Sequence, residues 1–239
     1  MDHHHTQENG EVAAQPPPGA GHGLKSSSDH DFDKDYWEQH WREARGRAAE
    51  DGLKPPTPHL VDELNGLIPG TALDAGCGEG ADAVWLAARG WQVTAADIAG
   101  EALAQAAGRA RPAAAPGSVQ WVEADLSTWQ PDVQFDLVTT SYAHPVMPQL
   151  DFYQRLSTWV APGGTLLIVG HAHHAETAGH AHGQHPPAEA SVTAAGIMAR
   201  LDGSRWEIET AEERVRTVPG SSGHAKTLHD VVVRAVRLP

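Results

Sequence analysis

Three glycines alternate with other residues directly after a short apolar segment, in Leu73-Asp74-Ala75-Gly76-Cys77-Gly78-Glu79-Gly80. The apolar segment predicts a strand over 72–75, and the residues after the loop predict a helix over 81–89. Glycine lets the backbone approach a ligand closely, and the start of the helix offers unpaired N–H donors. The same glycines also satisfy the spacing of a dinucleotide-binding loop. The pattern therefore predicts a loop that holds a small ligand, without identifying it.

Strands and helices alternate along most of the chain, which is typical of a parallel sheet with helices on both faces. Near the end, two strands over 206–217 and 229–236 have no helix between them, so we expect them to pair antiparallel. We predict a Rossmann-like three-layer α/β sandwich, with a seven-stranded, mostly parallel sheet and an antiparallel last strand. The other predicted strands are 91–96, 119–123, 135–140 and 165–170. The other predicted helices are 59–67, 101–109, 152–160 and one that begins near Asp31. Pro162-Gly163-Gly164 is a predicted turn.

The length of 239 residues suits one substantial α/β domain. The first 28 residues contain runs of histidine, proline and serine and almost no large apolar side chains, so burial cannot offset their chain entropy. We therefore expect a disordered tail over 1–28 and a single domain over 29–239, with a His-rich loop at 171–190.

The formal net charge is −14, with no visible cluster of lysine and arginine. Nucleic acids and anionic membranes need a basic surface, so we expect neither as a partner. No apolar run approaches the length of a membrane span, and the first residues do not resemble a signal peptide, so we expect a cytoplasmic protein. Cys77 is the only cysteine, which excludes an intrachain disulfide. A small neutral or cationic substrate fits this charge best, and no pattern indicates an oligomeric state.

Three aspartates lie at the ends of the first three predicted strands of the sheet or directly after them. Asp74 precedes the glycines, where a carboxylate suits a cationic amine and would repel a pyrophosphate. Asp97 ends the second strand about twenty residues further on, where a carboxylate takes ribose hydroxyls. Asp125 follows the third strand, where it meets an adenine amino group. Taken singly, each aspartate also suits a simpler role as a strand-end cap, a helix N-cap or a turn former.

Together with the Pro-Gly-Gly turn and the antiparallel last strand, these residues resemble class I S-adenosylmethionine-dependent methyltransferases over roughly 31–239. The resemblance implies that Asp74 and the glycine loop hold the methionine part of S-adenosylmethionine, Asp97 the ribose, and Asp125 with the next residue the adenine. The antiparallel last strand separates this family from nucleotide-dependent dehydrogenases. The predicted cofactor-binding residues are Trp37, Trp41, Asp74, Gly76, Cys77, Gly78, Gly80, Asp97, Ile98, Asp125, Leu126 and Ser141.

The aromatic segment Asp35-Tyr36-Trp37-Glu38-Gln39-His40-Trp41 precedes the first strand. It is similar to the first helix of small-molecule methyltransferases, including the tellurite-resistance and thiopurine groups, in which that helix covers the cofactor. Contact between a sulfonium cation and an aromatic face contributes ~0.5–2 kcal/mol of interaction free energy. The alternative is that these rings only pack on the edge of the sheet.

The fourth strand ends in Thr139-Thr140-Ser141-Tyr142-Ala143-His144. It lacks the Asn/Asp-Pro-Pro-Tyr pattern of enzymes that methylate the amino groups of adenine or glutamine. Ligands bind at the carboxyl ends of strands in open α/β sheets, so Ser141 and His144 should lie near the transferred methyl group. His144 is a candidate general base, although a structural role is equally compatible with the sequence. Cys77 is interpreted as a small loop residue rather than a nucleophile.

Six histidines lie between His171 and His185, just after the fifth strand. Three interpretations stay open for this loop: a metal site, a lid over the substrate, or a low-complexity insert with no specific role. Its histidines show no well-known ligand spacing, so no metal site is predicted. His171, directly after the strand, is the second candidate catalytic residue.

We therefore expect an enzyme that transfers a methyl group from S-adenosylmethionine to a small molecule at oxygen, nitrogen, sulfur or a related soft atom. One alternative is a metal-handling or binding protein that keeps this fold and uses the His-rich loop. The other is a nucleotide-dependent oxidoreductase that uses the same glycine loop.

Overall fold

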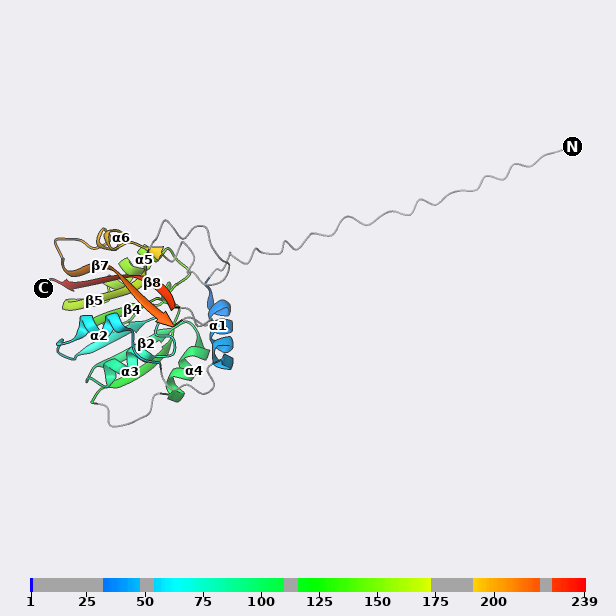
Figure 1. Cartoon of the computed structure of the whole chain (residues 1–239), viewed down its shortest axis with the longest axis horizontal. Coiled ribbons are helices and arrows are strands. Elements are labelled where there is room, and N and C mark those ends of the chain that lie inside the picture. Colours follow the sequence, from blue (N-terminus) through cyan, green and yellow to red (C-terminus); the bar gives the residue numbers. More distant parts are fainter. Residues whose placement is uncertain (2–31, 48–53, 110–115, 173–190, 220–224) are drawn as a thin grey trace.

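The computed structural model describes residues 1, 32–47, 54–109, 116–172, 191–219 and 225–239, in which one sheet lies between helices (Figure 1). The elements are α1 (Lys34–Arg47), α2 (Pro58–Leu64), β1 (Thr71–Ala75), α3 (Ala81–Ala87), β2 (Gln92–Asp97), α4 (Gly100–Arg109), β3 (Ser118–Glu123), β4 (Phe135–Ser141), α5 (Gln149–Ser157), β5 (Val160–Ala172), β6 (Ser191–Val192), α6 (Ala194–Met198), β7 (Trp206–Pro219) and β8 (Ala225–Arg237).

The strands lie in the order β3-β2-β1-β4-β5-β8-β7, and β6 pairs with β5 outside this path. All pairs are parallel except those of β8, which runs antiparallel to both β5 and β7. The predicted Rossmann-like fold and the antiparallel last strand are confirmed. The sheet has eight strands because the two-residue strand β6, which we did not predict, pairs with His171 and Ala172 at the end of β5.

Alternate residues of the buried strands pack against helices on opposite faces of the sheet. In β5, Leu166 and Ile168 join the cluster that contains Phe152 and Leu156 of α5. Leu167 belongs to the second cluster, with residues of α2 and α3. This two-sided burial accounts for the fully apolar sequence of the strand.

Several predicted boundaries shift by a few residues. The helix expected over 152–160 lies at Gln149–Ser157, because Val160 already pairs with Phe135 as the start of β5. The expected Pro162-Gly163-Gly164 turn lies inside β5, where the register with β4 shifts and Gly163 adopts a φ of 79°. The first helix begins as expected, because Asp33 accepts a hydrogen bond from the amide of Tyr36 as its N-cap.

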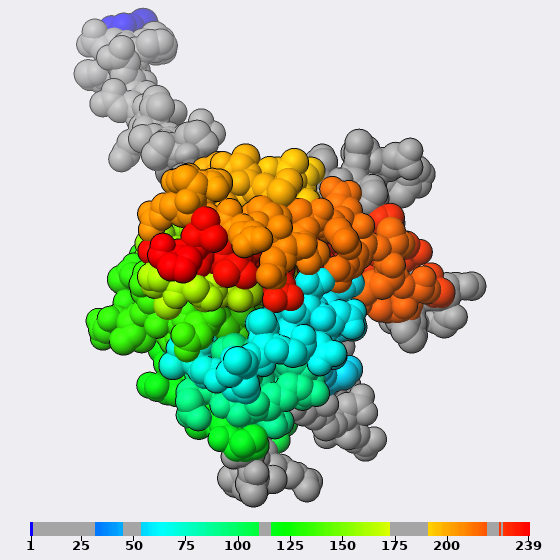
Figure 2. Space-filling view, turned by 90° about the vertical axis from the view of Figure 1, so that its left-hand side faces the viewer, coloured from blue at the N-terminus to red at the C-terminus, as the bar shows by residue number. Residues whose placement is uncertain are grey.

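The hairpin of β7 and β8 lies beside α2, as orange and red against cyan in Figure 2. Buried Glu63 of α2 accepts hydrogen bonds from Thr210 (2.8 Å) and Arg214 (2.6 Å) of β7. Nearby, His59 of α2 lies 3.0 Å from the carboxylate of Asp230, which is fully buried in β8. These contacts fix α2 to the hairpin at this edge of the sheet.

Within the described residues, no helix is long and apolar enough to cross a membrane. The predicted tail over 1–28 lies outside the described residues, apart from Met1, and so does 173–190 of the His-rich loop.

Candidate functional site

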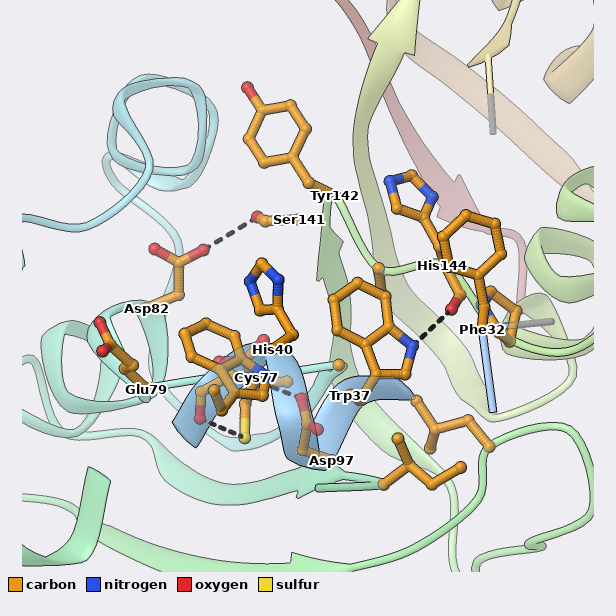
Figure 3. A pocket seen from close by; sticks show the side chains of 18 of the residues that line it. Phe32, Trp37, His40, Cys77, Glu79, Asp82, Asp97, Ser141, Tyr142 and His144 are labelled. Atoms are coloured by element: carbon orange, nitrogen blue, oxygen red, sulfur yellow. Dashed lines mark hydrogen bonds between the residues drawn. The ribbon is translucent and has the colours of Figure 1, made fainter. Parts of the chain in front are cut away.

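A cavity of 470 Å³ opens at the carboxyl ends of the parallel strands, beneath α1 (Figure 3). This is the edge of the sheet at which open α/β folds bind ligands. Both predicted catalytic residues and all but one of the predicted cofactor residues line the cavity. These lining residues are Trp37, Trp41, Asp74, Gly76, Cys77, Gly78, Asp97, Ile98, Asp125, Leu126, Ser141, His144 and His171.

Gly80 is the exception, because it is not among the residues that line the cavity. It is the N-cap residue of α3, with a φ of 77°. A Cβ atom at this position would lie 2.4 Å from the ring of Trp121. The glycine is therefore required by backbone conformation and close packing.

The first two glycines shape the floor of the cavity. The amides of Gly76 and Cys77 both donate to the carbonyl of Ala96 at the end of β2, at 2.8 and 3.1 Å. A Cβ at Gly76 would meet Ala143 at 2.3 Å, and one at Gly78 would meet the Trp41 ring at 2.8 Å. Both residues also have positive φ angles, so the loop leaves no room for side chains at these positions.

Asp74, at the end of β1, has a buried carboxylate that faces the cavity and is 2% exposed. Its Oδ2 atom has no hydrogen-bond partner among the described residues. Burial, and then the charges of Asp82 and Asp97, raise the pKa of Asp74 well above its usual range. A buried acceptor of this kind is stabilised by a cationic donor.

Asp97 and Asp125 are held by hydrogen bonds from the loops around them. Asp97 accepts from the amides of Gly78 (2.8 Å) and Ala99 (2.9 Å). Burial raises the pKa of Asp97, although these amides act in the opposite direction. Asp125 accepts from both the amide and the hydroxyl of Ser127, at 2.9 and 2.6 Å. Both carboxylates are therefore fixed before a ligand arrives, and each oxygen retains capacity for another donor.

The cavity is also lined by two acids that sequence analysis missed. Asp82, in the first turn of α3, accepts from the amide of Thr57 (2.7 Å) and the hydroxyl of Ser141 (2.9 Å). Glu79 pairs with Lys54 (3.0 Å) and Arg109 (2.9 Å). Burial works against the ionised form of Glu79, but these two cations hold its pKa below the usual range.

The charge of the cavity is consequently negative. Five carboxylates line it, and among the described lining residues Lys54 is the only lysine or arginine. Lys54 is already paired with Glu79. The remaining acids are therefore not neutralised by lysine or arginine of the lining, and the cavity attracts positive charge.

Helix α1 is tied to both sides of the cavity. Its Trp37 donates the indole N–H to the carbonyl of His144 at 3.2 Å. Its Glu38 accepts from the amides of Gly100 (2.9 Å) and Glu101 (3.2 Å) at the start of α4. The ring of Trp41 packs against Gly78 of the glycine loop. The aromatic residues of α1 therefore both pack against the domain and line the cavity.

Rings gather at the other end of the cavity, around His144. Its ring centroid lies 5.4 Å from that of His171, 5.6 Å from that of Phe32 and 6.5 Å from that of Trp37. Burial lowers the pKa of His144, although a hydrogen bond with Gln149 opposes this effect. The imidazole of His144 is therefore neutral at neutral pH.

Tyr142 forms the wall beside these histidines, and its ring centroid lies 4.8 Å from that of His171. It has a φ of 57°, which is rare for a bulky residue and marks local strain. Its hydroxyl accepts from Arg216 (3.0 Å), which also donates to Asp230 (2.5 Å). This polar network connects the cavity wall to the hairpin. No sequence pattern indicated it, because its members are far apart in the chain.

The family profile for a methyltransferase domain matches residues 72–164 of the chain. A Mycobacterium bovis protein described as an uncharacterized methyltransferase is 38% identical over 112 residues, which cover 46% of this chain and 55% of that protein. A probable thiol methyltransferase of Arabidopsis thaliana is 30% identical over 141 residues, or 56% of this chain and 60% of that one. The chain therefore matches only about half of the length of the mycobacterial relative.

Among solved structures, the fold is similar to a magnesium protoporphyrin IX methyltransferase of Synechocystis with bound SAH, the demethylated form of S-adenosylmethionine. The TM-score is 0.59 at 18% identity, over 85% of this chain and 97% of that one. Residues 72–164 therefore match a methyltransferase domain, and the fold of the chain is that of this solved methyltransferase.

Proposed function

We propose that this protein transfers a methyl group from S-adenosylmethionine to a small-molecule acceptor, at oxygen, nitrogen, sulfur or a related soft atom. One observation carries the proposal: Asp74, whose buried Oδ2 has no partner among the described residues, lines a cavity with an excess of carboxylates. Such a cavity favours a ligand that brings positive charge and disfavours a pyrophosphate. S-adenosylmethionine carries an ammonium and a sulfonium group, so its charge fits this site.

The lining residues can be assigned to the parts of this ligand. Asp74 and the backbone of Gly76, Cys77 and Gly78 would hold the methionine part. Trp37 and Trp41 would cover the ligand from α1, where aromatic faces favour a sulfonium. The remaining assignments are Asp97 with Ile98 for the ribose, Asp125 with Leu126 for the adenine, and Ser141 near the transferred methyl group.

When bound, S-adenosylmethionine supplies a methyl group on a sulfonium sulfur that is already activated for in-line displacement. The protein then has to position the acceptor, exclude water and remove a proton where the acceptor carries one. His144 and His171 are the proposed catalytic residues for this task. His144 can accept a proton, because burial lowers its pKa and favours the neutral imidazole.

The two alternative functions have weaker support. The carboxylate excess repels the phosphates of a nicotinamide dinucleotide, and the matching proteins are named methyltransferases. No group of three or more His, Cys, Asp or Glu side chains among the described residues could hold a metal ion. The histidines of 173–190 lie outside those residues and so contribute nothing to either argument.

A screen of acceptor classes tests the proposal. Purified protein would be incubated with S-adenosylmethionine and panels of small thiols, phenols, amines and carboxylic acids, and release of S-adenosylhomocysteine would be followed. The Arabidopsis relative supports the inclusion of thiols. We expect release with at least one class, and none from Asp74→Asn protein. Absence of release from the wild-type protein with every class would contradict the proposal.

A further inference from the structure

Gln149 lies at the start of α5, with 6% of its surface exposed, between the loop after β4 and the core. Its Nε2 atom donates to the backbone carbonyl of Ala143 at 2.9 Å. A carbonyl can only accept a hydrogen bond, so this contact determines which way the amide of Gln149 points. The Oε1 atom of Gln149 is therefore the one that faces His144.

The oxygen of Gln149 lies 3.3 Å from Nδ1 of His144. Because a carbonyl oxygen only accepts, Nδ1 must carry the proton of this hydrogen bond. In a neutral imidazole the other nitrogen then has a free lone pair, so Nε2 of His144 is the basic atom. No hydrogen bond to Nε2 occurs within the described part of the chain.

We propose that Gln149 is a positioning residue that holds His144 in the Nδ1–H tautomer, so that Nε2 of His144 takes a proton from the methyl acceptor. The inference rests on the proposed function and narrows its substrate class. The acceptor is a neutral molecule whose nucleophilic atom carries a removable proton, such as a thiol, a phenol or a ring N–H. Tertiary amines and thioethers, which have no such proton, are excluded.

In this step the nucleophilic atom of the acceptor forms a bond to the methyl carbon. The carbon–sulfur bond breaks and its electron pair stays on sulfur, while the proton of the acceptor passes to Nε2 of His144. The charge of the sulfonium thus reappears on the imidazolium, which returns its proton to water afterwards. The carboxylates that line the cavity would repel an acceptor that is already anionic, so such an acceptor is disfavoured.

The surroundings of His144 agree with this role. The rings of Phe32, Trp37 and His171 lie near the imidazole of His144 and leave it only partly exposed to water. The titratable and charged groups that line the same cavity are His40 of α1, Lys54 before α2, Asp74 of β1, Cys77 and Glu79 of the glycine loop, Asp82 of α3, Asp97 of β2, Asp125 after β3, Tyr142 after β4 and His171 of β5.

Long-range proton–nitrogen NMR of protein labelled with ¹⁵N-histidine tests the inference without an acceptor. The His144 signals would be assigned from their loss in His144→Asn protein. We expect wild-type His144 as the Nδ1–H tautomer and Gln149→Leu protein with a large Nε2–H population. Gln154→Leu makes the same change on the exposed side of α5 and should leave the tautomer as it is. An Nε2–H tautomer in the wild type, or no change in Gln149→Leu protein, would overturn the inference.

Kinetics with an acceptor from the screen give a second readout. Gln149→Leu should lower kcat at least about tenfold, because a misoriented base loses most of its contribution, and should leave the Kd for S-adenosylmethionine within about twofold.

Gln149→Glu keeps an acceptor for Nδ1–H and adds negative charge, so the acidic limb of the pH profile should move to higher pH. Unchanged kcat in Gln149→Leu protein, or an unmoved acidic limb in Gln149→Glu protein, would also overturn it. Failure of wild-type protein to bind S-adenosylmethionine would instead contradict the proposed function.

Discussion

The indole N–H of Trp37 donates to the backbone carbonyl of His144 across 3.2 Å, between residues 107 positions apart in the chain. This contact joins α1 to the loop that follows β4. Glu38, the next residue, joins the same helix to the start of α4 through two backbone amides. The position of α1 over the cavity therefore depends on polar contacts at both sides.

Replacement of Trp37 by Phe should weaken the binding of S-adenosylmethionine about fivefold. The substitution keeps an aromatic face but removes a hydrogen bond worth about 1 kcal/mol, so α1 covers the cavity for less of the time. Isothermal titration calorimetry gives the Kd. Trp85→Phe on α3 is the matched control, since Trp85 is not among the cavity residues and packs under Arg89 instead. Equal effects of the two substitutions would argue against a covering role for α1.

Replacement of Glu38 by Ala should reduce the free energy of unfolding by about 1 kcal/mol, as for the loss of a helix N-cap. The amides of Gly100 and Glu101 lose their acceptor, so their hydrogen exchange should become faster. Glu43→Ala is the control, because Glu43 is exposed and accepts a hydrogen bond from Gln39 of the same helix. Unchanged exchange at both amides would show that Glu38 does not cap α4 in solution.

Replacement of Asp74 by Asn should stabilise the ligand-free protein and abolish its binding of S-adenosylmethionine. The folded-state pKa of Asp74 lies above the unfolded value, so the folded protein loses stability as pH rises from about 4 through that raised pKa. Asparagine is neutral, so it removes this loss of stability at neutral pH. A gain of about 1 kcal/mol in the free energy of unfolding corresponds to a rise of about 2–4 °C in Tm for a domain of this size.

Differential scanning calorimetry at pH 7, with and without ligand, measures both effects on Asp74→Asn protein. At pH 4 the difference in Tm between the two proteins should shrink, because Asp74 is then protonated in the folded state. A lower Tm for Asp74→Asn protein at pH 7, or ligand binding as tight as that of the wild type, would contradict this account.

Replacement of Asp230 by Asn should destabilise the protein by about 3 kcal/mol, because it leaves Arg216 with an unpaired, partly buried charge. Burial acts to raise the pKa of Asp230, but its contacts with His59 and Arg216 hold it below the ordinary value of 3.8. Its contribution to stability is thus fully present above that value and disappears as pH falls through the lowered pKa.

Urea denaturation of Asp230→Asn protein checks this value. Glu209→Gln is the control: it breaks an ion pair on the same hairpin, with Arg234 at 2.7 Å, whose acidic partner is 38% exposed. An exposed pair should contribute less than about 1 kcal/mol. Similar losses from the two substitutions would indicate that the buried network does not support the cavity wall.

Local patterns were sufficient to predict the parallel strands and the antiparallel hairpin. The apolar run of β5 and the aspartates at the carboxyl ends of β1, β2 and β3 could be predicted from strand periodicity and the rule that ligands bind at strand ends. Strand β6 and helix α6 were missed because two and five residues are too few for periodicity to register.

The contacts between residues of the site could not be predicted from the sequence. Gly80 has the spacing of a ligand contact, but its neighbour is Trp121, 41 residues later by sequence number, and only the packed structure shows this. The pairs Asp82–Ser141 and Gln149–His144 depend on how loops from different strands meet. The sequence contains one indication of the role of Asp82, because it is an acid in the first turn of a predicted helix. It contains no such indication for Gln149.

The central claim is that the cavity binds S-adenosylmethionine through its carboxylates. Isothermal titration of purified protein at neutral pH, with S-adenosylmethionine and with NADH in separate runs, tests it most directly. The account predicts one equivalent of S-adenosylmethionine bound per chain, at least about tenfold weaker binding by Asp97→Ala protein, and no binding of NADH. Absence of S-adenosylmethionine binding to the wild-type protein, or undiminished binding to Asp97→Ala protein, would contradict it.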